Sequence, residues 1–145
     1  MKKKYIIIIV ILLAILTCIF ILKNNNSKFA GKADSVSSIK GVSISVKEYT
    51  LAHTDVVIII KNETDSDIET GTAFSIDKKV NGKWMKLKTK HDTFWNLISI
   101  IIPSNSEREF EYNWEDMYGK LEKGTYRLIK EINSKKIAVE FELED

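Results

Sequence analysis

The sequence predicts an all-β domain, built as a two-sheet sandwich, that follows one apolar N-terminal helix. Residues 5–22 contain no charged side chain, whereas all 20 acidic residues lie at or beyond Asp34. From Gly41 onward, apolar residues recur with a period of two, which is typical of strands that bury one face. Turn-forming residues interrupt this part of the chain about every ten residues, which favours many short strands. A small barrel is the alternative architecture, since it also buries one face of each strand.

The apolar segment is long enough to cross a membrane. Eighteen residues in a helix extend about 27 Å, close to the roughly 30 Å of a hydrocarbon core. Three lysines precede the segment, and this bias favours a cytoplasmic N-terminus with the rest of the chain outside. We therefore predict a cytoplasmic tip at residues 1–4 and a transmembrane anchor at residues 5–22.

Two alternatives for the N-terminus lead to the same side of the membrane. A cleaved signal has a shorter apolar region followed by small residues, but here the nearest small pair is Gly31 and Ala33. In a lipoprotein Cys18 would be acylated, although Thr17 stands where such signals usually carry a smaller residue. All three interpretations predict a location at the cell membrane, with the domain on its extracytoplasmic face.

Residues 23–40 are polar and rich in Asn and Ser, so they are predicted to form a flexible tether to a domain at residues 41–145. Within that domain Asn81-Gly82 is a strong hairpin signal, because both residues tolerate the positive φ of a type I′ turn. Asn133-Ser134 marks the final turn. The seven or eight predicted strands lie at residues 42–49, 55–62, 72–80, 83–88, 93–102, 107–114, 125–132 and 135–144.

The stretch "LEKGTYR", residues 121–127, narrows the fold further. In immunoglobulin-like sandwiches, a tyrosine near the start of the penultimate strand donates its hydroxyl to the backbone a few residues upstream. Gly124 suits the turn and Tyr126 suits this tyrosine corner; a tyrosine simply packed in the core is the alternative. The fold predicted is a seven- or eight-stranded immunoglobulin-like β-sandwich preceded by one transmembrane helix.

From Val57 to the C-terminus the chain resembles a bacterial immunoglobulin-like domain family found in small membrane-anchored or lipidated proteins of Gram-positive bacteria. The residues that carry the resemblance are "VVIIIKNETD", "NGKW" and "YNWEDMYGKLEKGTYRLIKEI". The resemblance implies a seven-stranded, disulfide-free sandwich on the cell surface. It implies no catalytic residues.

Composition excludes several classes of function. Six of the 22 basic residues precede Asp34, which leaves 16 basic against 20 acidic residues and a formal charge of −4 beyond that point. Such a balance argues against a nucleic-acid binder. The only cysteine is Cys18, so the domain has no disulfide, thiolate zinc site or cysteine nucleophile. No Gly-x-Ser-x-Gly elbow or glycine-rich phosphate loop occurs, so neither an enzyme nor a cofactor is predicted.

Two tryptophans are the first candidates for partner binding, because exposed tryptophans commonly anchor interfaces. The turn at Asn81-Gly82 pairs Trp84 with Lys79, outside the core. In residues 93–102, strand parity puts Trp95 and Leu97 on one face, opposite the face shared by Phe94, Ile98, Ile100 and Ile102. A register slip of one residue would instead bury either tryptophan.

The acidic stretch "NETDSDIE", residues 62–69, is the second candidate, with Asp65 and Asp67 as its binding residues. It lacks the glycine and the final glutamate of an EF-hand loop, so a solvated turn is favoured and a looser calcium site between strands is the alternative. His53 and His91 are expected to be ordinary surface residues.

These observations predict a non-enzymatic, membrane-anchored extracytoplasmic domain that binds or scaffolds a protein or another envelope component. The alternative is a surface inhibitor or immunity protein that blocks a protease or bacteriocin through its loops. A structural spacer without a ligand is a third interpretation.

Overall fold

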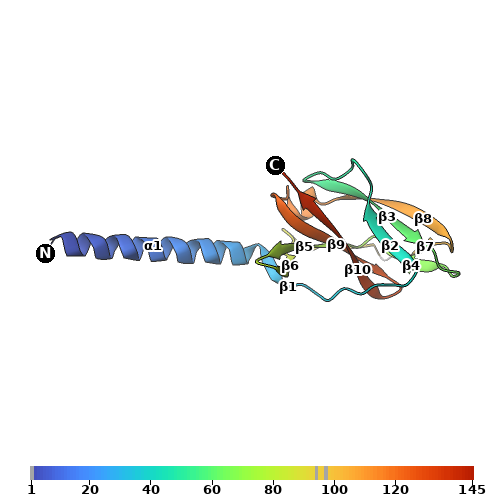
Figure 1. The fold of residues 1–145 in the computed structure, drawn as a ribbon, viewed down its shortest axis with the longest axis horizontal. Coiled ribbons are helices and arrows are strands. Elements are labelled where there is room, and N and C mark those ends of the chain that lie inside the picture. Colours follow the sequence, from blue (N-terminus) through green and yellow to red (C-terminus); the bar gives the residue numbers. More distant parts are fainter. Residues whose placement is uncertain (1, 94, 97) are drawn as a thin grey trace.

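The computed structural model describes residues 2–93, 95–96 and 98–145, and within the N-terminal helix it describes the side chains from Lys4 to Phe20. The helix α1, Lys2–Ser27, projects from one end of a β-sandwich (Figure 1). The described side chains of α1 are all exposed. The predicted all-β, two-sheet architecture is confirmed for the body of the chain.

Among the described residues ten strands form the two sheets, more than the seven or eight predicted. The strands are β1 (Phe29–Lys32), β2 (Val42–Val46), β3 (Asp55–Asn62), β4 (Ile68–Thr70), β5 (Ser75–Val80), β6 (Lys83–Leu87), β7 (Ile100–Ile102), β8 (Ser106–Asn113), β9 (Gly124–Ile132) and β10 (Lys135–Leu143); a one-turn helix α2 (Glu115–Tyr118) follows β8. The larger sheet has the order β1-β6-β5-β9-β4-β7, and β10 also pairs with β9 in this sheet. The smaller sheet has the order β2-β3-β8.

The two predicted turns occur where the sequence places them. Asn81 and Gly82 have φ values of 49° and 76°, as a type I′ turn requires, and they join β5 to β6. The resulting register pairs Lys79 with Trp84, as predicted. Asn133 and Ser134 likewise have positive φ and join β9 to β10, so both hairpins follow from local turn chemistry.

The predicted flexible tether at residues 23–40 needs correction. The helix α1 continues through Ser27, and β1 then pairs with β6, with Phe29 opposite Leu87. Farther along, the amide of Ser37 donates to the carbonyl of Lys136 at 2.7 Å. This stretch is therefore hydrogen-bonded to the larger sheet at two places. A four-residue strand is too short to show a period of two, which is why the sequence did not reveal it.

The predicted strand at residues 93–102 is also wrong over most of its length. Only the last three residues form a strand, β7, which pairs with β4. The amide of Ile98 donates to the carbonyl of Asn96 at 2.8 Å, a tight turn that ends any regular alternation. Ile98 is 53% exposed although Ile102 is buried, so they do not share a face as predicted. Phe94 and Leu97 lie outside the described residues.

The core lies between the two sheets and is supplied by the sandwich alone. From β3, Val56, Ile58 and Ile60 face Ile76 of β5 and Leu128 of β9, and all five are buried. Burying each such side chain stabilises the fold by about 1.5–3 kcal/mol. Every member of this core lies between residues 39 and 143. The sandwich therefore needs no residue of α1 for its packing.

The predicted transmembrane anchor at residues 5–22 coincides with part of α1, and the side chains at 21 and 22 lie outside the described residues. Across the described part of the chain, no helix combines the length and apolar character that crossing a membrane requires. This finding does not support the predicted transmembrane anchor.

Candidate functional site: a basic pocket beside the helix

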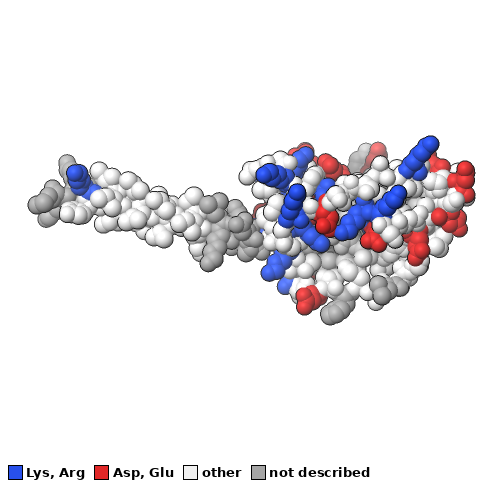
Figure 2. Space-filling view, turned by 90° about the horizontal axis from the view of Figure 1, so that it is seen from below, with Lys and Arg blue, Asp and Glu red and all other residues white. Residues whose placement is uncertain are grey.

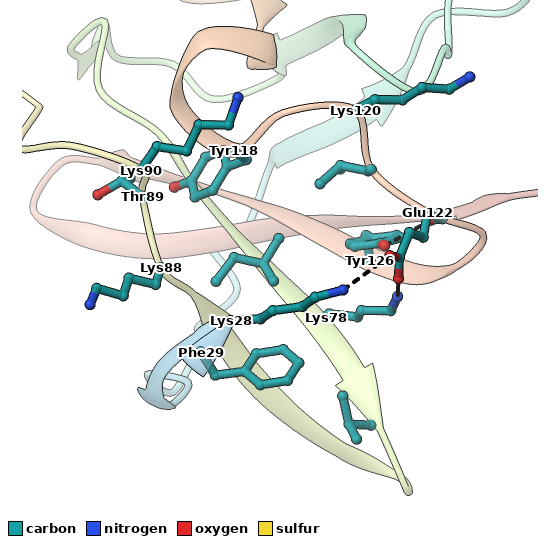
Figure 3. Close-up of a pocket in the computed structure, with 13 residues that line it drawn as sticks. Lys28, Phe29, Lys78, Lys88, Thr89, Lys90, Tyr118, Lys120, Glu122 and Tyr126 are labelled. Atoms are coloured by element: carbon teal, nitrogen blue, oxygen red, sulfur yellow. Dashed lines mark hydrogen bonds and ion pairs between the residues drawn. The ribbon is translucent and has the colours of Figure 1, made fainter. Parts of the chain in front are cut away.

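A cavity of about 590 Å³ opens at the end of the sandwich where α1 meets β1 (Figure 3). Four stretches of chain build it. Residues 28–29 follow α1 directly, and residues 78–80 belong to β5. Residues 87–90 run from the last residue of β6 into the loop after it, and residues 118–126 run from the last residue of α2 into the start of β9. The site thus depends on the fold, because no single segment contributes more than a part of its wall.

The wall of the cavity includes apolar and aromatic side chains. Leu121 and Tyr126 are buried members of the core, and Phe29 and Leu87 are half-buried. Phe29 and Leu87 sit opposite each other in the β1–β6 register, which brings both to the cavity. Because these rings and methyl groups are only partly covered, they leave apolar surface for a ligand.

Charge around the cavity is strongly positive. Five lysines and one glutamate line it, which gives a formal balance of +4. The described lysines are Lys28, Lys78, Lys88, Lys90 and Lys120. In Figure 2 the basic side chains gather at the end of the sandwich next to α1, whereas acidic side chains dominate the opposite end. A concave site lined by one sign of charge concentrates ligands of the other sign.

The single acid of the pocket, Glu122, is shared by two lysines. Its carboxylate lies 3.0 Å from the Lys28 ammonium and 3.9 Å from that of Lys78. The hydrogen bond and charge of Lys28 hold the pKa of Glu122 below its usual value. Figure 3 shows the ammonium groups of Lys28 and Lys78 converging on this carboxylate. The Glu122 side chain is 69% exposed and that of Lys28 is 53% exposed, whereas the Lys78 side chain is only 21% exposed. An incoming anion therefore competes with Glu122 for Lys28 at little cost.

The other three lysines lie around the margin of the pocket. Lys90 is positioned by its ammonium, which donates to the carbonyl of Glu115 at 3.0 Å, and by its amide, which donates to Met117 at 2.8 Å. Lys88 and Lys120 are exposed and form no ion pair with any described residue. Their charges are consequently available to a ligand.

The tyrosine corner forms one wall of the same pocket. The Tyr126 hydroxyl donates to the carbonyl of Glu122 at 2.8 Å, four residues upstream, which is the geometry expected of such a corner. Burial and the Glu122 charge raise the pKa of Tyr126 to about 12. Gly124 has φ of +141°, and a Cβ there would lie 3.1 Å from Cε of Lys78. The corner therefore holds both Glu122 and Lys78 beside the cavity.

The two tryptophans differ from each other. Trp84 is half-buried outside the core, as predicted, with its ring 4.6 Å from the Arg127 guanidinium and 5.3 Å from the Lys79 ammonium. Trp95, predicted to lie outside, instead packs against the core, edge-on to Phe74 at 5.2 Å. The alternation that placed Trp95 outside is lost because the described residues between 93 and 99 are not in a strand.

The acidic candidates lie elsewhere. Asp65 and Asp67 are exposed in the loop between β3 and β4, and the Asp67 carboxylate accepts the amide of Ser104 at 3.0 Å. Asp67 thereby ties two loops together. Among the described residues, no group of three or more His, Cys, Asp or Glu side chains is placed to hold a metal ion.

The remaining candidates are not brought together. Cys18 is exposed on α1. His53 is half-buried rather than an ordinary surface residue, and its ring nitrogen lies 2.6 Å from the Leu121 carbonyl. His91 is exposed, 3.1 Å from Asp116, and its own contact with the Asp92 carbonyl, together with the Asp116 charge, raises its pKa.

The basic pocket was not predicted from the sequence. Its lysines are spread from residue 28 to residue 120, and none lies in a recognisable motif. The one local signal is the alternation of Lys88 and Lys90, which puts two charges on one side of an extended segment. Lys28 reaches the same site only because β1 pairs with β6, and the spacing of Lys88 and Lys90 does not predict that pairing.

Comparison with known proteins identifies the family. The profile described as "Bacterial Ig-like domain" matches residues 38–142. Among solved structures, the chain is similar to Pseudomonas fluorescens alkylpurine DNA glycosylase AlkC bound to DNA containing an abasic site analog, with 15% identity and a TM-score of 0.40 over 72% of this chain and 31% of that one. No curated protein matches the chain significantly. Because the family profile spans most of the sequence, this chain belongs to the bacterial Ig-like domain family.

Proposed function

We propose that this chain is a non-enzymatic extracytoplasmic module that binds an anionic component of the cell envelope through the basic pocket. The observation that carries the proposal is the charge contrast. The pocket has a formal balance of +4, of which Lys28 contributes one charge, so its residues beyond Asp34 still sum to +3 although residues 34–145 as a whole have a formal charge of −4. An overall acidic domain that gathers lysines around one apolar cavity is suited to selective capture of an anion rather than to general adhesion.

The proposed location rests on the N-terminal sequence and on the family. Three lysines followed by the uncharged residues 5–22 favour insertion with the sandwich outside. A bacterial Ig-like domain is consistent with a surface module, and the family is generally non-enzymatic. In this proposal the N-terminal segment holds the sandwich at the membrane, as an uncleaved anchor or through lipidation of Cys18.

Two measurements test the proposal in order. First, intact cells carrying the full chain with a C-terminal tag are treated with protease. We expect loss of the sandwich without lysis; protection until lysis would contradict the location. Mass analysis of the mature chain then separates an unmodified anchor from a protein that begins at acylated Cys18.

The second measurement is capture from an envelope extract by immobilised residues 28–145, a fragment that retains β1 and the entire core. We expect capture to be lost in Lys88→Glu/Lys120→Glu. Lys40→Glu/Lys135→Glu is the matched control, because it changes the charge equally at exposed lysines outside the pocket. Equal capture by both variants would reject the pocket as the binding site. If capture instead requires Asp65 and Asp67, the binding site is the acidic loop between β3 and β4.

A further inference from the structure

We infer that the ligand of the basic pocket is a phosphate-bearing amphiphile, the headgroup of an anionic phospholipid with the first part of its apolar chain. The inference rests on the proposed function and names the class of ligand for the same site. It follows from three features of the pocket: the kind of cations, the apolar wall, and the position next to α1.

The cations suit a phosphate group. Among the described lining residues every cation is a lysine and none is an arginine. The planar fork of arginine binds carboxylates and phosphates alike through two parallel hydrogen bonds, whereas lysine binds phosphate as a point charge. Lysines act as point charges, and several of them around one centre match the three acceptor oxygens and spread charge of a phosphate group. Lys28 and Lys78 already converge on one anionic group, the carboxylate of Glu122, so the pocket has a ready position for such a group.

The size and the wall favour an amphiphile over a free phosphate ion. A volume of about 590 Å³ lies within the range of roughly 300–1,000 Å³ that is typical of sites for organic ligands. Phe29, Leu87 and Tyr118 are each half-buried at this cavity, next to the buried Leu121. A small, fully hydrated anion would leave these apolar groups facing water, whereas the glycerol and acyl carbons of a lipid would cover them.

The position selects a lipid over a soluble phosphate compound. Lys28 and Phe29 are the first two residues after α1, so the pocket opens at the end of the sandwich from which α1 projects (Figure 1). If the N-terminal segment enters a membrane, as proposed, this end of the sandwich faces the headgroups. Lysines near an anionic membrane surface are attracted to it, so the marginal lysines would strengthen the same contact.

Glu122 supplies a further test of the pocket. Its carboxylate occupies Lys28 and Lys78, so a phosphate must compete with it. Only its backbone carbonyl takes part in the tyrosine corner, which means that Glu122→Gln leaves that hydrogen bond in place. We expect Glu122→Gln to bind the ligand several-fold more tightly.

The experiment measures binding of residues 28–145 to three probes. The probes are vesicles of phosphatidylcholine with phosphatidylglycerol, short-chain phosphatidylglycerol below its micelle concentration, and glycerol phosphate; vesicles of phosphatidylcholine alone are the blank. We expect binding to the mixed vesicles and the short-chain lipid, at least tenfold weaker binding to glycerol phosphate, and none to the blank. Lys88→Glu/Lys120→Glu should reduce vesicle binding at least about tenfold, while Lys40→Glu/Lys135→Glu should not.

Three other outcomes would contradict the inference that the ligand is an anionic lipid. Equal binding of glycerol phosphate and the short-chain lipid would assign the pocket to a soluble phosphate compound. An equal loss in both double variants would show general attraction to charge rather than a site. If no probe binds while the wild-type fragment still captures an envelope component through the pocket, the lipid inference fails and the proposed function stands. Circular dichroism of each variant serves as the control that it is folded.

Discussion

The two faces of β9 show two ways of burying a positive charge. Arg127 points to the outer face of the larger sheet, where its guanidinium lies 2.9 Å from the Asp77 carboxylate and also donates to the carbonyl of Asp34. Lys130, three residues on, points into the core and is 1% exposed. Among the described residues its ammonium donates to two carbonyls, those of Gly71 at 2.6 Å and Ala73 at 2.8 Å, and to no carboxylate.

The difference appears in the preferred charge state. Arg127 has a carboxylate partner in Asp77. Burial without a carboxylate lowers the pKa of Lys130 from 10.5 to about 8, and its nearest rings are Phe110 and Tyr112 of the opposite sheet. One side chain is therefore a fixed structural ion, and the other is a charge that the fold tolerates at a cost. Four substitutions and one titration test this contrast.

The largest effect is expected from removing the partner of Arg127. In Asp77→Ala the Arg127 side chain, which is 7% exposed, stays buried without its carboxylate partner. Because an uncompensated buried charge is costly, the free energy of unfolding should fall by about 3–5 kcal/mol. Urea denaturation of residues 28–145 measures the change. Asp145→Asn is the control, because its pair with Lys123 is exposed and should contribute less than about 1 kcal/mol. Similar midpoints for the two variants would mean that the Arg127–Asp77 pair contributes little.

The next effect belongs to Lys130 and depends on pH. Below pH 8 both the folded and unfolded states hold the proton, and the cost of burying the charge is fully present. Between about 8 and 10.5 the unfolded chain holds a proton that the folded chain has released, so stability rises with pH, by about 1.4 kcal/mol per unit at most. The difference of about 2.5 units corresponds to roughly 3 kcal/mol in total.

Unfolding measured from pH 7 to pH 10 checks this rise. Above pH 10 the buried tyrosines oppose it, because the raised pKa of Tyr126, about 12, makes the folded state hold its proton longer than the unfolded state. Lys130→Met keeps most of the length of the side chain and removes the titrating group, so the free energy of unfolding of this variant should be flat from pH 8 to pH 10. The same rise in this variant would show that another group causes it.

The third effect concerns the tyrosine corner. Tyr126→Phe removes the donor to the Glu122 carbonyl and should lower the free energy of unfolding by about 1–3 kcal/mol. Tyr49 is fully exposed, so Tyr49→Phe is a matched control that should change nothing measurable. An unchanged urea midpoint for Tyr126→Phe would mean that solvent satisfies the Glu122 carbonyl.

Features governed by adjacent residues could be predicted from the sequence, and features assembled from distant residues could not. Asn81-Gly82 and the spacing of Gly124 and Tyr126 are local signals, and the structure has the corresponding turn and corner hydrogen bond. The position of Trp95 depends on a tight turn at Asn96 that no pattern reveals. The alternation along β9 places Lys130 on the face that points into the core, as the sequence allows one to predict. Its hydrogen-bond partners could not be predicted, because they lie in the loop at residues 71–73, far away in sequence.

The smallest effect on stability is expected at Trp84, which covers the Arg127 guanidinium on the outer face of the sheet. Trp84→Ala removes this stacking and should lower the free energy of unfolding by about 1 kcal/mol, less than Asp77→Ala because the ion pair survives. Trp84 does not line the basic pocket, so capture of the envelope component should be unchanged in the folded variant. A loss of capture equivalent to about 2 kcal/mol or more would instead identify Trp84 as an interface anchor. The outer face of the larger sheet would then be a second binding surface, separate from the pocket beside α1.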